Sequence, residues 1–165
     1  MASIGVGKIE DILAMQGLTE SDHAAGNPAC IASLLKYMEK DFEGLCFTNL
    51  VDTDSAYGHR NDVQGFAGAL EEIDRAIPEM KARLRDGDLM ILTADHGCDP
   101  GDESTDHTRE YIPLIVFGRS VAPTPIGTKL CFGSIAATVC ELLDVSFTPD
   151  GGESLAGLLC KEDET

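Results

Sequence analysis

The stretch "LMILTADH", residues 89–96, decides how this chain is expected to fold. Its first six residues form a short apolar run after the turn "DGD" (86–88), a pattern typical of a buried strand. Asp95 and His96 follow directly, where the predicted strand ends. Ionisable side chains at the carboxyl end of a strand are typical of α/β sheets, which bind ligands at that edge.

The same layout occurs earlier in the chain. A second apolar run, "GLCFTNLV" (44–51), is closely followed by Asp54. Between the two runs, apolar residues at spacings of three and four predict an amphipathic helix with Asn61 as its N-cap. Pro78 falls inside this helix, so we expect a kink or a break into two helices near Ala76. Strand, helix and strand thus follow one another.

Three further elements extend this alternation. Apolar periodicity predicts a helix over 30–42 that covers the strand at 44–51, and a helix over 134–145 with Ser134 as N-cap. "YIPLIVFG" (111–118) reads as a strand whose proline indicates an edge or a bulge. The predicted fold class is therefore α/β, a mostly parallel sheet flanked by helices.

The predicted organisation is one core domain over residues 1–160, followed by a tail over 161–165. The opening stretch "MASIGVGKIEDI" shows no preceding strand, and few strands are predicted for a fold of this type. We therefore expect the chain to be part of something larger.

Composition excludes several partners. Twelve basic residues against 29 acidic ones give a net charge of −17, which argues against a nucleic-acid or anionic-membrane surface. The six cysteines show no CxxC spacing, and the sequence has neither a signal peptide nor a transmembrane run. We expect a cytoplasmic protein with reduced thiols.

Histidine and carboxylate side chains gather after the predicted strands. Neutral imidazole and carboxylate are ligands of divalent ions such as manganese, zinc or ferrous iron. The predicted metal ligands are Asp54, His59, Asp95, His96 and His107. The alternative is that each histidine caps an element and the acidic residues form a solvated face; His23 is expected to be structural or exposed.

Three motifs carry a resemblance to a known family. "TNLVDTDSAYGHRND" (48–62), "TADHGCDP" (93–100) and "TDHTREYIPLIVFG" (105–118) resemble the phosphopentomutases of the alkaline phosphatase superfamily. "IGVGKIEDILAMQGLTES" (4–21) is similar to the segment by which that family's chain returns to its core from a cap domain. The resemblance implies a partial alkaline-phosphatase-like core.

The resemblance also implies an activity and a set of ligands. Members of the family transfer a phosphoryl group between O1 and O5 of ribose or deoxyribose phosphate beside two divalent ions, usually manganese. By resemblance, Asp54, His59 and His107 bind one ion, and Asp95 and His96 bind the other. Lys8 matches a lysine expected near the substrate phosphate.

Parts of the family pattern have no match. The nucleophilic threonine, a further metal-binding aspartate and the cap domain are absent from this sequence, so the isolated chain is expected to be an inactive carboxyl-terminal portion. Its expected partners are a pentose phosphate, the missing amino-terminal portion or a second copy of itself. Two alternatives stay open: a cofactor-independent phosphoglycerate mutase or phosphatase, and a catalytically silent metal-binding or interaction module.

Overall fold

The computed structural model describes residues 1–159, so the predicted tail at 161–165 lies outside the described residues. The strands are β1 (Ala2–Val6), β2 (Glu20–Asp22), β3 (Gly44–Thr48), β4 (Met90–Thr93) and β5 (Leu114–Phe117). The helices are α1 (Ile9–Ile12), α2 (Asn27–Glu39), α3 (Val63–Arg83), α4 (Gly133–Leu142) and α5 (Ala156–Leu159). A π-helical segment, η1 (Asp52–Tyr57), and a 3₁₀ turn, η2 (Gly58–Arg60), follow β3.

The chain divides into two compact units. The first comprises residues 1–84 and 92–114, and the second comprises 85–91 and the residues from 115 onward. The predicted single domain over residues 1–160 stays a prediction. All the predicted metal ligands belong to the first unit.

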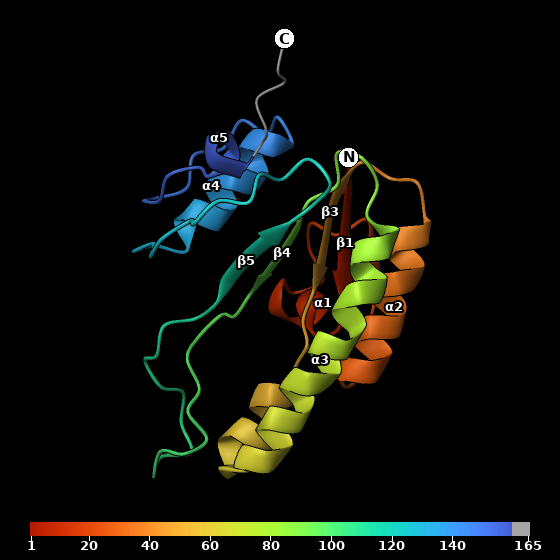
Figure 1. Ribbon diagram of the computed structural model, residues 1–165. Helices are drawn as coiled ribbons and strands as arrows, with labels where there is room; N and C mark the ends of the chain where they lie inside the picture. Colours follow the sequence, from red (N-terminus) through yellow and green to blue (C-terminus); the bar gives the residue numbers. More distant parts are fainter. Residues whose placement is uncertain (160–165) are drawn as a thin grey trace. The chain divides into compact units, whose positions relative to one another are not determined.

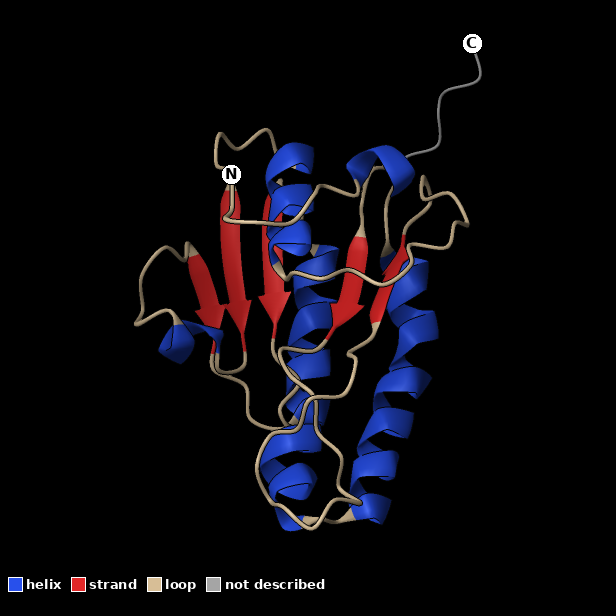
Figure 2. Ribbon diagram, turned by 90° about the vertical axis from the view of Figure 1, so that its left-hand side faces the viewer, coloured by secondary structure: helices blue, strands red, loops and turns tan. Residues whose placement is uncertain are grey.

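A three-stranded parallel sheet of order β2-β1-β3 forms the centre of the first unit. β1 pairs with β3 from Ala2 opposite Gly44 to Val6 opposite Thr48, so both strands end at the same edge. β4 and β5 pair with each other as a two-stranded sheet. The predicted α/β class, a mostly parallel sheet flanked by helices, is confirmed (Figures 1 and 2).

The opening stretch, for which no strand was predicted, contains the central strand. Ile4 and Val6 of β1 are buried against Cys30 and Tyr37 of α2. Burial of these four side chains is what makes the first residues of the chain part of the core.

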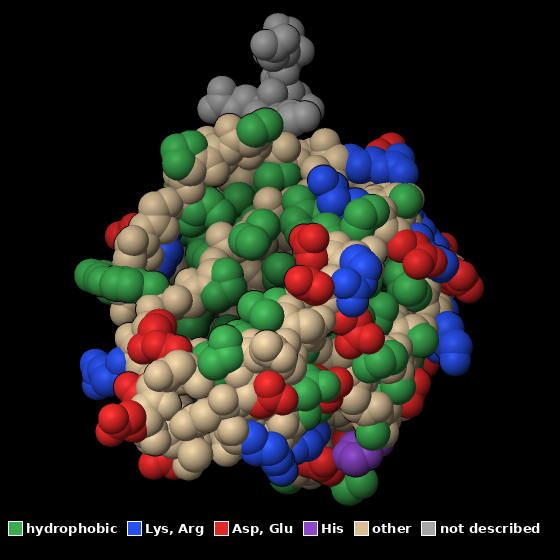
Figure 3. Space-filling view, turned by 60° about the horizontal axis from the view of Figure 1, so that its bottom comes forward, with side chains coloured by type: hydrophobic (Ala, Val, Ile, Leu, Met, Phe, Trp, Pro, Cys, Tyr) green, Lys and Arg blue, Asp and Glu red, His purple; other side chains and the backbone are tan. Residues whose placement is uncertain are grey.

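The two faces of this sheet differ. Residues paired in neighbouring parallel strands point to the same face of the sheet. By this register, Leu45 and Phe47 of β3 point to the face opposite to the one that carries the core side chains. Ile9 and Leu18 cover Gly5 on that face, but Leu45 is 38% and Phe47 53% exposed. Figure 3 shows one face of the molecule, where hydrophobic side chains reach the surface among acidic and basic ones. Part of the second sheet face is therefore open to solvent.

α2 and α3 lie side by side in the first unit (Figure 1). α2 begins three residues before the predicted start, because Pro28 suits the first turn of a helix, and it ends at Glu39. It contacts β3, as predicted, and also β1.

α3 corrects two predictions. Its N-cap is Asp62, whose side chain accepts a hydrogen bond from the Gly65 amide (2.9 Å), whereas Asn61 adopts a left-handed conformation one residue earlier. The predicted break near Ala76 is wrong, since one helix runs through Pro78. Contacts with α2 and η1 hold the helix along its length.

Two smaller differences concern the remaining elements. Pro113 precedes β5 instead of lying inside it. Ser134 is not the N-cap of α4; it is buried in the first turn, where its carbonyl accepts the Thr138 hydroxyl (2.6 Å). Among residues 1–159, no helix is both long and apolar enough to cross a membrane.

Candidate metal centre

Three segments bring the predicted ligands together in the first unit. Asp54 lies in η1 and His59 in η2, directly after β3. Asp95 and His96 follow β4, and His107 lies on the way to β5. An antiparallel bridge between Gly97 and Thr108 folds the last two segments into a hairpin.

A reciprocal pair of hydrogen bonds fixes the start of η1. The Asn27 amide donates to the Asp52 carboxylate (2.8 Å), and the Asp52 amide donates to the Asn27 side-chain oxygen (3.1 Å). Asn27 is fully buried at the start of α2. Residues after β3 are thereby anchored to the helix that covers the sheet.

Asp54 is the centre of the cluster. Its Oδ1 lies 3.2 Å from Nε2 of His59, 3.4 Å from Nε2 of His107 and 3.9 Å from Nε2 of His96. This oxygen is buried and has no hydrogen-bond partner among the residues that the structure describes. A buried, unpaired carboxylate oxygen is costly, so the arrangement calls for a positive charge.

Backbone carbonyls fix two of the imidazole rings. Nδ1 of His59 lies 2.6 Å from the Thr105 carbonyl oxygen, and Nδ1 of His96 lies 3.0 Å from the Gly97 carbonyl oxygen. A carbonyl accepts only, so each Nδ1 must carry the proton and donate it. In the neutral ring, Nε2 then presents a lone pair to the Asp54 carboxylate. Metal-binding histidines are commonly held in this way.

The rings also pack on one another. His96 and His107 are stacked, with ring centroids 3.6 Å apart and an interplanar angle of 17°. His59 lies 5.0 Å from His107, tilted by 37°. The three rings thus occupy neighbouring positions around the Asp54 carboxylate.

Two glycines permit the close approach of the segments. A Cβ at Gly58 would lie 2.5 Å from Sγ of Cys98, and one at Gly97 would lie 2.7 Å from the Glu110 amide nitrogen. Thr108 closes the hairpin: its amide donates to the Gly97 carbonyl (3.0 Å), and its hydroxyl accepts from the Asp99 amide (2.9 Å). Larger side chains at 58 or 97 would force the ligands apart.

The structure groups the predicted ligands unevenly. Asp54, His96 and His107 each offer one ligand atom, and these atoms lie within 4.8 Å of one another. His59 adds a fourth close to Asp54. Asp95 is mostly exposed, and its Oδ1 lies 3.7 Å from Nε2 of His96.

Lys8 and His23 lie outside this cluster. Lys8 is exposed and stands two residues after the end of β1, at the sheet edge where β3 also ends. His23 is exposed and binds the Asp11 carboxylate at 2.7 Å, which raises the pKa of its imidazole. His23 is thus an exposed residue whose contact with Asp11 is structural.

Cys98 lies beside the cluster. Burial raises the pKa of its thiol, and the Asp54 carboxylate raises it further. Both effects favour the thiol over the thiolate. This agrees with its packing contact against Gly58.

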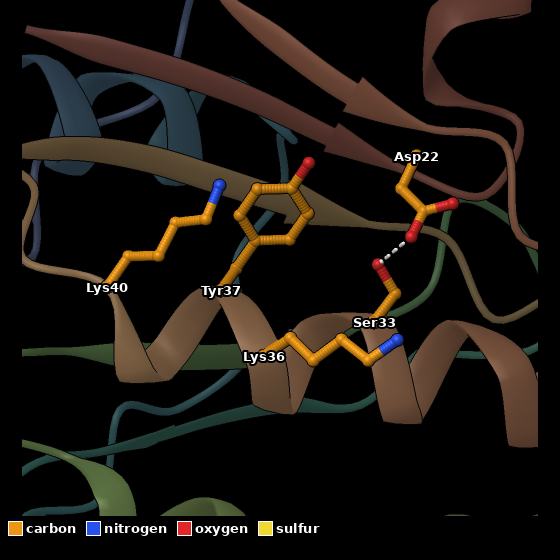
Figure 4. A pocket seen from close by; sticks show the side chains of 5 residues that line it. All are labelled: Asp22, Ser33, Lys36, Tyr37 and Lys40. Carbon is orange, nitrogen blue, oxygen red and sulfur yellow. Dashed lines mark hydrogen bonds between the residues drawn. The ribbon is translucent and has the colours of Figure 1, made fainter.

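A pocket of about 170 Å³ lies elsewhere in the first unit (Figure 4). Its lining residues are Asp22, Ser33, Lys36, Tyr37 and Lys40. The Ser33 hydroxyl donates to Asp22 (2.6 Å), while Lys40 binds Glu20 and lies over the Tyr37 ring. These contacts engage several polar groups of the pocket. Two groups of possible metal ligands occur within residues 1–159, one around Asp54 and one around His23, and only the first contains the predicted ligands.

Sequence reasoning missed the groups that orient the ligands. The Thr105 and Gly97 carbonyls act through the backbone, so their residue types give no signal. Asn61, which donates to the Asp102 carbonyl (3.0 Å), was interpreted as a helix cap. Its place directly after "GHR" was the available indication of a role beside the ligands.

The site and the parallel sheet define the class of protein. The sequence matches the Metalloenzyme superfamily over residues 9–147, and the chain belongs to that superfamily. The chain is also similar to several phosphopentomutases, which confirms the predicted resemblance.

Three of these relatives illustrate the match. The chain is 51% identical over 155 residues to the phosphopentomutase of Acetivibrio thermocellus. It is 50% identical over 149 residues to that of Alkaliphilus metalliredigens and 48% identical over 159 residues to that of Alkaliphilus oremlandii. The alignments cover 93%, 90% and 96% of this chain, but only 40%, 38% and 40% of the relatives. The chain thus spans about two fifths of the length of these relatives.

Proposed function

We propose that this chain is the metal-binding portion of a phosphopentomutase, an isomerase that moves a phosphoryl group between O1 and O5 of ribose or deoxyribose phosphate. The observation that carries the proposal is the buried Asp54 oxygen facing three imidazole nitrogens. The similarity to phosphopentomutases supplies the reaction type.

The proposed ligands follow the family pattern. Asp54, His59 and His107 hold one divalent ion, and Asp95 and His96 contribute to the second. The stated distances around Asp54 support the first set, and the 3.7 Å approach of Asp95 to His96 supports the second. His96 lies close enough to Asp54 to bring the two sets into one cluster.

Manganese is the proposed metal. Oxygen and imidazole ligands suit manganese, and the proposed ligand set contains no thiolate. When bound, the ions would neutralise phosphate oxygens and hold the transferring group in line. In a protein of net charge −17, this also offsets repulsion of an anionic sugar phosphate.

Lys8 is proposed to bind the substrate phosphate. It is exposed and follows β1 at the sheet edge beyond which Asp54 lies. An ammonium group there adds a positive charge to an acidic surface.

The nucleophile is proposed to come from outside this chain. The Thr93 hydroxyl donates to the Pro113 carbonyl (2.9 Å), which engages it within the β4–β5 pair. The proposed partners are therefore a pentose phosphate and a polypeptide corresponding to the rest of the relatives' length, or a second copy of the chain. The proposed location is the cytoplasm, and no nucleic-acid or membrane partner is proposed.

An activity assay tests this function. The purified chain with ribose 1-phosphate and manganese should give no turnover, and adding a polypeptide that supplies the unmatched part of a relative should restore it. A Thr93→Ala variant is the control, and it should behave as the wild type does. Activity of the chain alone that is lost in Thr93→Ala would contradict the proposal. Metal binding without activity after complementation would favour a silent metal-binding module.

A further inference from the structure

Two segments that leave different strands must keep a fixed separation for the ligands to converge. Asp54 and His59 belong to the segment after β3, whereas His96 and His107 belong to the hairpin after β4. Two side-chain bonds cross between these segments: His59 Nδ1 to the Thr105 carbonyl, and Asn61 Nδ2 to the Asp102 carbonyl. The first bond uses a proposed ligand, and the second uses a residue outside the ligand set.

The backbone holds Asn61 in place on its own segment. Asn61 has φ 52° and ψ 31°, in the left-handed region that asparagine tolerates better than most residues. Its amide donates to the Gly58 carbonyl (3.1 Å), and the next residue, Asp62, is the N-cap of α3. The side chain therefore projects from a position fixed at both ends.

The position of the Asp102 carbonyl is also fixed by local hydrogen bonds. The Asp102 amide donates to the Asp99 carbonyl (3.1 Å), and its carboxylate accepts from the Ser104 amide (2.8 Å). A carbonyl can only accept, so the NH₂ group of Asn61 must face it. The Asn61 oxygen is buried without a hydrogen-bond partner within residues 1–159, so this bond fixes the orientation of the amide.

We infer that Asn61 is a positioning residue for the metal centre. It ties the hairpin that carries His107 to the segment that carries Asp54 and His59. The inference rests on the proposed metal site and adds to it a residue that binds no metal itself. Residues that orient ligands in this indirect way typically change metal affinity about 10- to 100-fold when they are replaced.

Two variants separate the bond from the backbone conformation. Asn61→Gly keeps the left-handed conformation and removes the amide, while Asn61→Asp keeps the side-chain shape and places an acceptor against the Asp102 carbonyl. Asp144→Gly is the matched control, because Asp144 also has φ 52° and belongs to the second unit. Each protein is titrated with Mn²⁺ by calorimetry and with Co²⁺ by visible absorption, and is melted in chelator.

Both Asn61 variants should bind Mn²⁺ about tenfold or more weakly than the wild type, and their Co²⁺ spectra should shift. Asp144→Gly should match the wild type in affinity and spectrum. A purely structural role would lower the chelated melting temperature and leave the Co²⁺ spectrum of the folded protein unchanged. Wild-type affinity and spectrum in Asn61→Gly would overturn the inference alone. A wild-type chain that binds neither ion would overturn the metal site as well.

Discussion

Asp54 and its three imidazole neighbours form an arrangement whose stability depends on positive charge. The carbonyls of Thr105 and Gly97 hold Nδ1–H of His59 and His96, so the lone pairs of Nε2 face the carboxylate. A nitrogen lone pair and a carboxylate repel each other, whereas a cation attracts both. The centre therefore has donor atoms positioned to bind a cation.

At this scale the residue patterns predicted the ligand types, and only the resemblance to a known family implied their grouping. Adjacent Asp95 and His96 after an apolar run, and Asp54 followed five residues later by His59, were sufficient to predict ligands at strand ends. The proximity of His96 to Asp54, at 3.9 Å, depends on contacts between distant segments. Spacing along the chain cannot give such a distance, because the hairpin and η1 meet only in the fold.

His59→Ala should weaken manganese binding by about tenfold or more, since water only partly replaces a lost ligand. A tenfold loss corresponds to about 1.4 kcal/mol. Melting of each protein in chelator and in manganese is the measurement: metal should raise the wild-type midpoint well above that of the variant. In chelator the variant should melt only slightly below the wild type, because His59 is 40% exposed and its removal costs one hydrogen bond, to the Thr105 carbonyl.

His23→Ala is the control for this experiment, because His23 is an exposed histidine outside the cluster. Its metal-induced shift should equal that of the wild type. Equal stabilisation of His59→Ala and the wild type by manganese would return His59 to the structural interpretation.

The pKa of His23 should lie above 6.5, because the hydrogen bond and charge of Asp11 favour the imidazolium. The folded pKa is raised, so the stability that this pair contributes is fully present below 6.5 and is lost as pH rises through the folded pKa. Proton NMR titration of the imidazole signals measures it. Asp11→Asn should lower the His23 pKa, and a His23 pKa unchanged by that substitution would assign the shift to another cause.

At the level of helices and strands, the sequence predicted those elements that have a local sequence signal. The apolar runs that became β3 and β4 are visible in any short window, as is the periodicity of α3. β2, with the sequence "ESD", has no apolar residue and is a strand only because it pairs with β1. β1 itself is five residues long and contains Ser3 and Gly5, which weaken its strand pattern.

α3 contains a proline that should reduce its stability. Pro78 cannot donate to the carbonyl one turn earlier, and its ring crowds that carbonyl. Pro78→Ala should therefore raise the free energy of unfolding by about 1–3 kcal/mol, less than the full helix penalty because α3 already accommodates the ring. Urea unfolding followed by circular dichroism measures this change.

Glu71→Ala is the matched control in α3. Glu71 makes an exposed ion pair with Arg75 at 3.5 Å, so its loss should change stability by less than about 0.5 kcal/mol. If Pro78→Ala left stability unchanged or lowered it, the helix would need its proline for packing against its neighbours.

For the whole molecule, the dominant electrostatic fact is a net charge of −17. Like charges repel most in the compact state, so folding is opposed at low ionic strength. Raising sodium chloride from 10 mM to 150 mM shortens the screening length from about 30 to about 8 Å. The melting temperature in chelator should rise over this range, and calorimetric melting would detect it. A fall with salt would show that specific ion pairs, such as those of Arg83, outweigh the general repulsion.

Salt has a different effect on the open sheet face around Leu45 and Phe47. At low ionic strength the charge keeps one molecule's apolar face away from another's, so the chain stays dispersed. Screening removes that protection, and kosmotropic salts strengthen apolar contact. The wild type should therefore precipitate at a lower ammonium sulfate concentration than Phe47→Ser, because the substitution removes the exposed ring. We expect charge to keep the molecules apart at low salt, and the exposed side chains of β3 to set the salt concentration at which they precipitate.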